Sequence, residues 1–299
     1  VLEAREATTE EIQWIHTESY HQKIESTRDC GHRQLDPDTH VSSESYRVAK
    51  LAAGGLCTLV DAACSGRIRN GFALVRPPGH HAEANRGMGF CIYNNVAIAA
   101  RYAQKRGFAE KVLIVDWDLH HGNGTQHSFE SDPSILYFSS HQFPYYPGTG
   151  RPDETGMGNA KGYTVNVPLP EGQGNEDFIR IYQEVLEPIA NQFKPDLVLV
   201  SAGFDTYYQD PLGGMGVTEE GFAEITRILM RIADACCQGK IVLTLEGGYH
   251  LEGLARSVKR VILALQEPGL RATASPKSSH RTEQIVEHIR DTQKGYWRF

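Results

Sequence analysis

The stretch VLIVDWDLHHGN at residues 112–123 decides the fold. Its first four residues are apolar and lack the alternation of a half-exposed strand, so they predict a strand that is buried on both faces. Acids and imidazoles follow at once, at Asp116, Asp118, His120 and His121. Ligands of open α/β sheets bind outside the carboxyl ends of the strands. The stretch therefore predicts a parallel sheet with a polar site at its edge.

Four further apolar runs are predicted to be strands of the same sheet. Helical stretches separate them, at residues 93–105, 176–193 and 218–237. Strands that alternate with helices are typical of βαβ units, in which helices cover both faces of a parallel sheet. We therefore predict an α/β fold: a single three-layer domain with a central, mainly parallel sheet and helices on both faces. The predicted strands are residues 72–75, 112–115, 135–138, 197–200 and 241–245.

No break divides residues 1–265, which are predicted to form one domain. Residues 266–299 are predicted to comprise a linker and a short amphipathic helix that packs on the domain or extends from it. A long Gly- and Pro-rich stretch is typical of a functional loop. Further helices are expected at residues 8–25 and 43–63, the loop at 142–161 and the linker at 268–282.

Composition narrows the classes of function. The formal charge is −7 and the pI about 6.0, which argues against the basic footprint of a nucleic-acid-binding protein. No apolar run approaches the roughly 18 residues that span a membrane. None of the six cysteines forms a CxxC pair. We expect reduced cysteines, a cytoplasmic location, and neither nucleic acid nor membrane as a partner.

Asp118, His120 and Asp205 are predicted to bind one divalent cation. Alternate residues of an extended chain point the same way, so Asp118 and His120 can bind side by side, and Asp205 follows another predicted strand. One imidazole and two carboxylates leave a position open for water, as in catalytic zinc sites. Oxygen-rich ligation also suits Fe(II) or Mn(II). The alternative is a solvated surface run, which the preceding buried strand disfavours.

The pair His80-His81 follows the predicted strand at residues 72–75. Beside a dication the two imidazoles titrate differently, so one can stay neutral and act as a base. Asp116 and Asn123 are the natural partners to fix their tautomers. The alternative is one structural and one exposed histidine. Tyr249 follows Gly-Gly, where a phenol suits oxyanion stabilisation, although a lone tyrosine there is equally compatible with a structural role.

Seven motifs together resemble the histone deacetylase and acetylpolyamine amidohydrolase family of the arginase-deacetylase superfamily. They occur in the family's order, and two of them, HHGNGTQ and DPLGG, look more like the class II branch. Family members usually carry a segment containing His-Pro-Glu upstream of the position of Ala7, which this sequence lacks. The motifs are RPPGHH (76–81), GFCIYNN (89–95), DWDLHHGNGTQ (116–126), YYPGTG (145–150), GFD (203–205), DPLGG (210–214) and LEGGY (245–249).

The resemblance implies a zinc-dependent amidohydrolase that removes acetyl or other acyl groups from Nε-acyl-lysine of proteins or peptides. One zinc ion would bind Asp118, His120 and Asp205. His81 would be the general base and then the acid, His80 an electrostatic partner held by Asp116, and Tyr249 a donor to the substrate carbonyl. The resemblance also implies substrate contacts at Gly89, Phe90, Tyr146, Leu212 and Asp38.

Family members also bind potassium behind the zinc. The resemblance implies two sites in this sequence, formed partly by backbone oxygens. The first would use Asp116, Asp118, His120, Ser139 and Ser140, and the second would lie near Phe129, Asp132, Ile135 and Tyr163.

Three other functions remain open. An acetylpolyamine deacetylase tends to place an acid at the tunnel mouth, where this sequence has Leu212. Arginase-like ureohydrolases use two manganese ions and more aspartates. A catalytically weak module that only binds acyl-lysine would keep the tunnel without turnover. The expected partners are thus an acyl-lysine peptide or protein, or an acetylated small amine, and the sequence leaves a homo-oligomer open.

Overall fold

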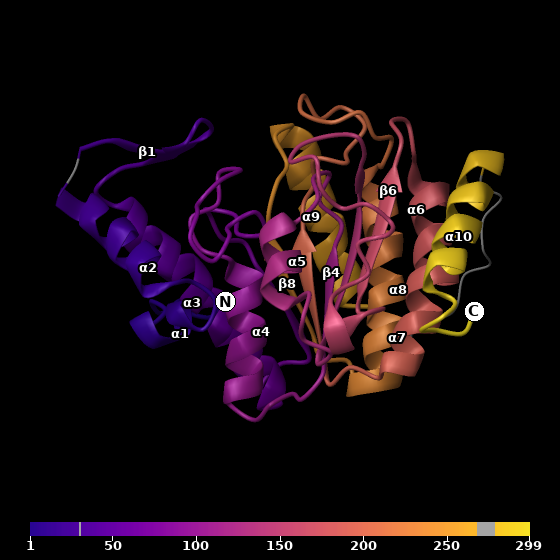
Figure 1. Ribbon diagram of the computed structural model, residues 1–299, viewed down its shortest axis with the longest axis horizontal. Helices are drawn as coiled ribbons and strands as arrows, with labels where there is room; N and C mark the ends of the chain where they lie inside the picture. The colour runs from indigo at the N-terminus through magenta and orange to yellow at the C-terminus, as the bar shows by residue number, and fades with distance from the viewer. Residues whose placement is uncertain (30, 268–278) are drawn as a thin grey trace.

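The computed structural model describes residues 1–29, 31–267 and 279–299. Its centre is a six-stranded sheet with the order β3-β8-β7-β4-β5-β6, in which all neighbouring strands are parallel (Figure 1). The predicted parallel sheet between helices is thereby confirmed. The strands are β3 (Asn70–Ala73), β4 (Val112–Asp116), β5 (Ile135–Gln142), β6 (Thr164–Leu169), β7 (Leu197–Ala202) and β8 (Ile241–Leu245).

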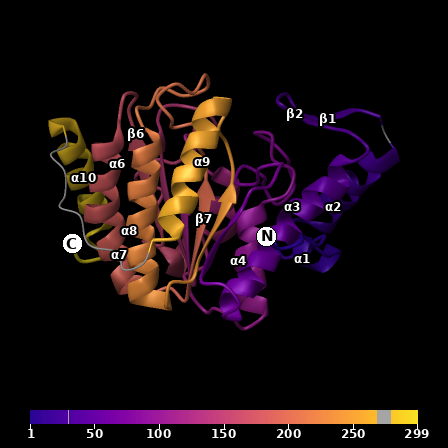
Figure 2. The ribbon, with the colours of Figure 1, turned by 180° about the vertical axis from the view of Figure 1, so that it is seen from behind.

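Helices cover both faces of the sheet because its four central strands, β8, β7, β4 and β5, each supply buried apolar side chains to two cores. On β4, Leu113 and Val115 belong to one core, while Val112 and Ile114 belong to the other. Figures 1 and 2 show the two helical layers from opposite sides. The first core includes α6 (Asn175–Ile181), α7 (Glu187–Phe193), α8 (Glu219–Cys237) and α9 (Leu251–Leu265). The second includes α1 (Thr9–Gln13), α2 (Glu18–Glu25), α3 (Ser45–Cys64), α4 (Asn95–Lys105) and the end of α5 (Asn123–Phe129).

The strand predictions need two corrections. The strand expected at residues 72–75 is β3, which begins at Asn70 because its register with Ile241 of β8 sets its bounds. β6 was not predicted from the sequence. Asn166 and Pro168 interrupt its apolar run, and an edge position in the sheet tolerates such a proline.

Two predicted helices are interrupted. The helix expected at residues 8–25 is α1 and α2, because Thr17 accepts the Tyr20 N–H with its side chain and so begins a new helix. The helix expected at 176–193 contains a π-helical turn, η3 (Tyr182–Leu186), before Pro188. A proline lacks the N–H that would bond the carbonyl four residues earlier.

That carbonyl, on Glu184, instead accepts Nε and Nη2 of Arg290 at 3.1 and 2.9 Å. Arg290 belongs to α10 (His280–Gln293), which packs beside the edge strand β6. Gln293 Nε2 donates to the Thr164 carbonyl at 3.0 Å, and Trp297 Nε1 donates to the Gly162 carbonyl at 2.7 Å. The C-terminal helix therefore covers an edge that would otherwise be open to pairing (Figure 1).

The predicted linker at residues 268–282 lies mostly outside the described residues. Its last three residues belong to α10, which starts at His280. The long loop predicted at 142–161 contains only a short 3₁₀ turn, η2 (Gly158–Ala160). A two-stranded hairpin that the sequence reading missed, β1 (Arg33–Asp36) and β2 (Thr39–Val41), projects at the upper left of Figure 1.

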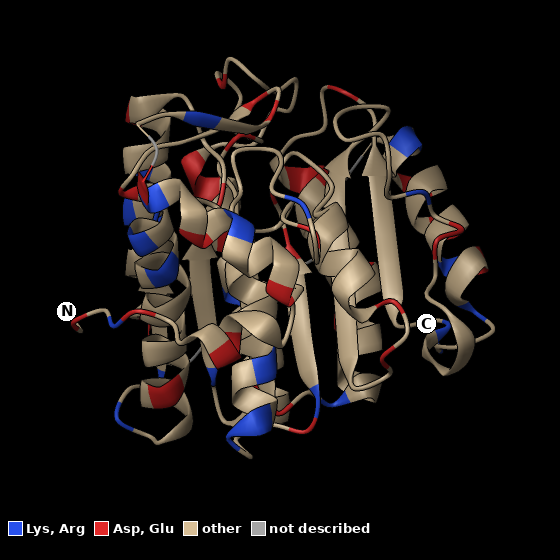
Figure 3. Cartoon of the chain, turned by 60° about the vertical axis from the view of Figure 1, so that its left-hand side comes forward, with Lys and Arg blue, Asp and Glu red and all other residues tan. Residues whose placement is uncertain are grey.

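Acidic and basic residues are interspersed along the helices and loops of the side shown in Figure 3. Five cysteines of the described chain are free thiols, and Cys30 lies outside it. Within the described ranges, the helices are all too short or too polar to cross a lipid bilayer.

Candidate metal centre and active site

The candidate site lies where the strand order of the sheet changes direction. From β4 the chain proceeds to β5 and β6 on one side, whereas β7 and β8 lie on the other. Asp118 and His120 follow β4 directly, and Asp205 follows β7, its neighbour. A crevice at the carboxyl ends of strands forms at such a point in open α/β sheets. The topology thus brings together three residues that are far apart in sequence.

Ligand atoms of Asp118, His120 and Asp205 all lie within 4.8 Å of one another. His120 Nδ1 is 3.1 Å from Asp118 Oδ1 and also 3.1 Å from Asp205 Oδ2. Asp205 Oδ2 is buried, yet it has no well-directed hydrogen bond within the described chain. One ring N–H cannot be directed at both carboxylates, whereas one cation satisfies all three atoms. The donor set therefore fits a divalent metal.

Protonation of His120 and Asp205 depends on the balance between burial and the charges of their neighbours. Burial opposes the charge of His120, but hydrogen bonds and charge from Asp118 and Asp205 raise its pKa to about 10. Burial, together with the Asp118 carboxylate, raises the pKa of Asp205 to about 6. A proton and a metal ion thus compete for the same atoms, so metal binding releases protons.

Two glycines leave room for the carboxylates. A Cβ on Gly247 would lie 2.7 Å from Asp118 Oδ2 and still closer to Asp205 Oδ2. A Cβ on Gly203 would also collide with Asp118. The Gly247 N–H donates to Asp118 Oδ2 at 2.9 Å. Gly203 of GFD and Gly247 of LEGGY are therefore required because the carboxylates of Asp118 and Asp205 approach them closely.

His80 and His81 lie beside this centre and have different partners. His80 Nδ1 is 3.0 Å from Asp116 Oδ2, and His81 Nδ1 is 2.8 Å from Asn123 Oδ1. Burial disfavours a charge on His80, but Asp116 and Asp118 raise its pKa to about 10. Burial and the positive neighbours His80 and His120 hold the pKa of His81 well below 6.5. The two imidazoles are thus held in opposite protonation states at neutral pH.

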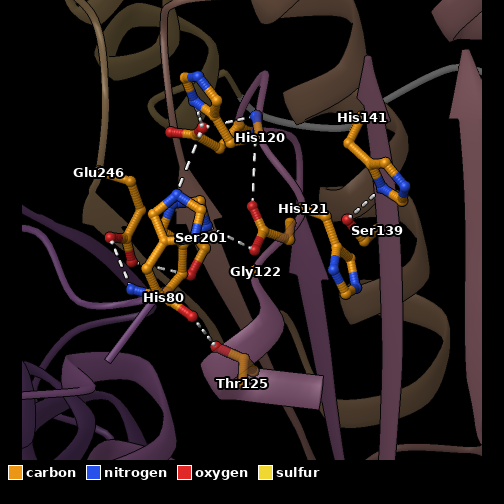
Figure 4. A network of polar contacts seen from close by, with 12 residues as sticks. His80, His120, His121, Gly122, Thr125, Ser139, His141, Ser201 and Glu246 are labelled. Atoms are coloured by element: carbon orange, nitrogen blue, oxygen red, sulfur yellow. Dashed lines mark hydrogen bonds and ion pairs between the residues drawn. The ribbon is translucent and has the colours of Figure 1, made fainter. Parts of the chain in front are cut away.

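Glu246, directly after β8, anchors the backbone at His80. Its Oε2 accepts the N–H groups of Gly79 and His80 at 2.6 and 3.2 Å, and its Oε1 accepts the Ser201 hydroxyl at 2.9 Å. Burial raises the pKa of Glu246 to about 7. Figure 4 shows Glu246 on one side of His80 and Thr125 on the other.

Above the metal ligands the site is a narrow cavity of about 100 Å³. Small-molecule pockets commonly measure about 300–1,000 Å³, so this one suits a slim, unbranched group. The Phe90 and Tyr249 rings meet edge to face with centroids 5.9 Å apart, and Tyr146 lies 5.1 Å from His81. All five predicted substrate residues line the cavity: Asp38, Gly89, Phe90, Tyr146 and Leu212.

The missed hairpin positions one wall of the cavity. Phe90 has a φ of +66°, a left-handed conformation that is uncommon for a residue with a side chain. Asp38 Oδ1 accepts the Gly89 N–H and Thr39 Oγ1 accepts the Phe90 N–H, each at 3.0 Å. The turn between β1 and β2 therefore holds this strained segment in place.

Residues of the first expected potassium site lie together. Asp116 and Ser139 are paired in register on β4 and β5, behind the metal ligands. Ser140, the next residue, has its hydroxyl 3.0 Å from the Tyr182 hydroxyl.

The second expected potassium site has its carbonyls engaged. Backbone oxygens of Phe129, Asp132 and Tyr163 accept N–H groups of Asp132, Ile135 and Tyr137 at 2.9, 3.2 and 2.9 Å. The Asp132 carboxylate is 2.5 Å from Arg101 Nη1. Each carbonyl keeps a second lone pair. A potassium ion at this site would have to bind those second lone pairs and would lie close to the positive charge of Arg101.

Glu246, Glu83 and Asp210 all contact segments of the candidate site, and none of the three was predicted from the sequence to have a role. Glu246 follows a buried strand, the same signal that identified Asp116. Glu83 stands two residues after His81, and Asp210 opens the motif DPLGG. The contacts of Glu83 and Asp210 join segments far apart in sequence, so spacing gives no signal for them.

Comparisons with known proteins point to one family. Residues 1–265 match the histone deacetylase domain family. Histone deacetylase 15 of Arabidopsis thaliana is 43% identical over 302 residues, covering 99% of this chain and 54% of that protein. A probable deacetylase of Archaeoglobus fulgidus is 43% identical over 253 residues, covering 85% of this chain and 70% of that protein.

Polyamine deacetylase HDAC10 of Danio rerio is 40% identical over 306 residues, covering 98% of this chain and 45% of that protein. The chain spans about half the length of the plant and fish relatives. The crystal structure of the HDA15 HD domain matches with a TM-score of 0.92 at 44% identity, covering 99% of this chain and 81% of that chain.

Proposed function

Because the chain belongs to the histone deacetylase domain family, we propose that it is a zinc-dependent amidohydrolase that deacylates Nε-acyl-lysine in proteins or peptides. The observation that carries the proposal is the convergence of Asp118, His120 and Asp205, two of which, Asp118 and His120, line a narrow cavity together with His81 and Tyr249. Zinc bound there would supply Lewis-acid polarisation of the acyl carbonyl and lower the pKa of a bound water.

His81 is the proton carrier in this proposal. Its Nδ1 faces Asn123, so Nε2 is the nitrogen left to take the proton of the attacking water. The lowered pKa of His81 keeps that nitrogen unprotonated beforehand. The same nitrogen then gives the proton to the leaving amine, which departs as the amide bond breaks. His80, protonated beside Asp116, supplies positive charge next to the developing oxyanion.

Tyr249 completes the polar groups around the acyl carbon. Burial raises the pKa of its phenol, so the hydroxyl stays protonated and can donate a hydrogen bond to the acyl oxygen. Donors placed where charge develops stabilise the transition state more than the ground state. Gly89, Phe90 and Tyr146 all line the cavity, so the Gly89 carbonyl would accept the substrate amide N–H, and the rings of Phe90 and Tyr146 would flank the aliphatic stem.

The apolar rim favours a lysine side chain over a polyamine. Leu212 is 39% exposed at the cavity mouth, where its apolar side chain offers no charge to a distal amine. Asp38, which also lines the cavity, accepts the Gly89 N–H and the Thr39 hydroxyl with Oδ1, and its second oxygen would contact the backbone of a peptide substrate. The similarity to a polyamine deacetylase makes acetylated polyamines the second candidate substrate.

The test compares turnover of an acetyl-lysine peptide with that of acetylputrescine by the zinc-loaded protein. We expect a higher kcat/KM for the peptide, abolished by a chelator and lowered about a hundredfold or more in Tyr249→Phe. Preference for acetylputrescine would favour a polyamine deacetylase. Stoichiometric zinc with peptide binding but no turnover would favour a binding module. Turnover that survives zinc removal, or full activity in Tyr249→Phe, would contradict the proposal.

A further inference from the structure

Asn123 is part of a longer chain of contacts that reaches the surface. Its Nδ2 donates to Glu83 Oε1, and the same carboxylate meets His127 Nδ1 at 2.9 and 3.0 Å. His81, Asn123, Glu83 and His127 thus form one hydrogen-bonded series. His127 is 43% exposed in its side chain, whereas His81 and Asn123 are buried.

The direction of the hydrogen bonds in this series is fixed because Glu83 can only accept them. Burial alone would raise the pKa of Glu83, but hydrogen bonds from His127 and Asn123 hold it below its usual value, so the group is a carboxylate. A carboxylate accepts and never donates, so the Asn123 NH₂ must face Glu83. The Asn123 carbonyl oxygen then faces His81, which must carry its proton on Nδ1.

Glu83 is the strong determinant of that amide orientation. A rotated Asn123 would direct its carbonyl oxygen at the Glu83 carboxylate, where two acceptors would face each other. Nδ2 has two other contacts, the His81 carbonyl at 3.4 Å and the thioether sulfur of Met88 at 3.6 Å. The first is long and the second is to a weak acceptor, so neither competes with the Glu83 carboxylate. Asparagine alone is symmetric in shape and does not choose between the two orientations.

The Glu83 backbone is fixed independently of its side chain. Its N–H donates to the Arg86 carbonyl at 2.8 Å, and its carbonyl accepts His16 Nδ1 at 2.9 Å. A change of side chain therefore leaves the local chain path in place. The Glu83 side chain is therefore not needed to hold this backbone, and its contacts with Asn123 and His127 can be tested separately.

We propose that Glu83 is a positioning residue that fixes the Asn123 amide and, through it, the His81 tautomer with Nε2 open for proton transfer. The proposal rests on the proposed function only for its kinetic consequence. The tautomer itself is a property of the folded, zinc-loaded protein and is measured without substrate.

The first experiment replaces the acceptor. Glu83→Met keeps the length of the side chain but cannot accept from Asn123, whereas Glu83→Gln keeps a carbonyl oxygen. We expect kcat to fall about tenfold to hundredfold in Glu83→Met with little change in KM, and Glu83→Gln to retain most activity. Glu130→Met, which removes another carboxylate near His127, is the matched control and should behave as wild type.

The second experiment tests whether the effect of Glu83→Gln on kcat changes from harmful to beneficial when residue 123 is a carboxylate. Asn123→Asp places two carboxylates against each other, so kcat should fall. Adding Glu83→Gln to that variant supplies an NH₂ donor to the introduced carboxylate and should raise kcat again. Glu83→Gln should thus be slightly harmful in the wild-type background and beneficial in Asn123→Asp.

The third experiment reads the tautomer directly by ¹⁵N NMR of histidine-labelled, zinc-loaded protein, with His81→Ala for assignment. Wild type and Glu83→Gln should show a protonated Nδ1 and an unprotonated Nε2 on His81, and Glu83→Met a mixture. An unchanged His81 tautomer and an unchanged kcat in Glu83→Met would overturn the inference. If Glu83→Met does not fold, the second experiment decides: Glu83→Gln must raise kcat in the Asn123→Asp background for the inference to stand. If the NMR spectra show the expected tautomers but wild type does not turn over acyl-lysine, the proposed function is contradicted and this inference is still supported.

Discussion

Oδ2 of Asp210 lies 2.7 Å from the backbone nitrogen of Tyr249 and accepts its N–H. The same oxygen accepts the His250 N–H at 3.1 Å, and Oδ1 accepts the Leu212 N–H at 3.0 Å. One buried carboxylate therefore ties the loop that carries the phenol to the loop that carries the rim leucine. Two motifs of the sequence, DPLGG and LEGGY, are thereby joined into one structural unit.

Asp210→Ala is expected to lower kcat/KM about tenfold to hundredfold, because each hydrogen bond to a charged group contributes about 1.5–3 kcal/mol. Tyr249 would lose the anchor that keeps its hydroxyl over the metal site. Steady-state kinetics on an acetyl-lysine peptide measure the effect. Asp153→Ala, which removes a carboxylate that is 77% exposed in another loop, is the control. Equal kinetics for the two variants would refute this role of Asp210.

Gly247→Ala is expected to weaken zinc binding at least about tenfold, because the new Cβ collides with the carboxylates of Asp118 and Asp205. Zinc content after dialysis against a competing chelator measures the affinity. Gly216→Ala is the matched control, since the nearest atom to its Cβ lies 3.5 Å away. Circular dichroism verifies that both variants fold. Unchanged zinc affinity in Gly247→Ala would show that the ligands lie elsewhere.

Removal of zinc is expected to abolish turnover reversibly and to lower stability. A metal that binds only the folded state adds about 2.7 kcal/mol when its free concentration is a hundred times Kd. Thermal unfolding with and without a chelator, followed by zinc addition, measures both effects. Reconstitution with Mn(II) or Fe(II) in parallel identifies which ion restores turnover best. A melting temperature that does not respond to zinc would contradict a site at Asp118, His120 and Asp205.

His16 is expected to make the fold acid-sensitive. Burial lowers its pKa to about 4, and its neutral ring bonds the Glu83 carbonyl and the Asn94 N–H, each at 2.9 Å. The unfolded chain, with a pKa near 6.5, binds the proton first as pH falls. Stability from this group is therefore full above pH 6.5 and is lost toward pH 4, by about 3 kcal/mol.

Urea unfolding between pH 7.5 and 4.5 measures this dependence. His16→Gln should be less stable than wild type at pH 7.5 and should have a shallower decline with acid, because it has no proton to gain. Identical slopes for the two proteins would rule out His16 as a source of the acid sensitivity. Other buried histidines, such as His141, contribute to the slope that remains.

The central strands were predictable because they are apolar on both faces. Residues 112–115, 135–138, 197–200 and 241–245 all lie within strands of the structure. β6 was not predictable in the same way, since Asn166 and Pro168 break its apolar pattern and its outer edge is covered by α10. Pro188 is a sequence signal for the interruption before it, but the partner of the freed Glu184 carbonyl, Arg290, lies about a hundred residues later and has no such signal.

The sequence by itself determined the parallel sheet and the kinds of side chain at its carboxyl edge, because burial and residue type act locally along each strand. Only the tertiary structure decided that β4 and β7 are neighbours, which brings Asp205 to Asp118 and His120. It also decided the contacts of Asp210, Glu83 and the hairpin with the catalytic segments. Those contacts join residues tens of positions apart, and their geometry depends on packing that no spacing encodes.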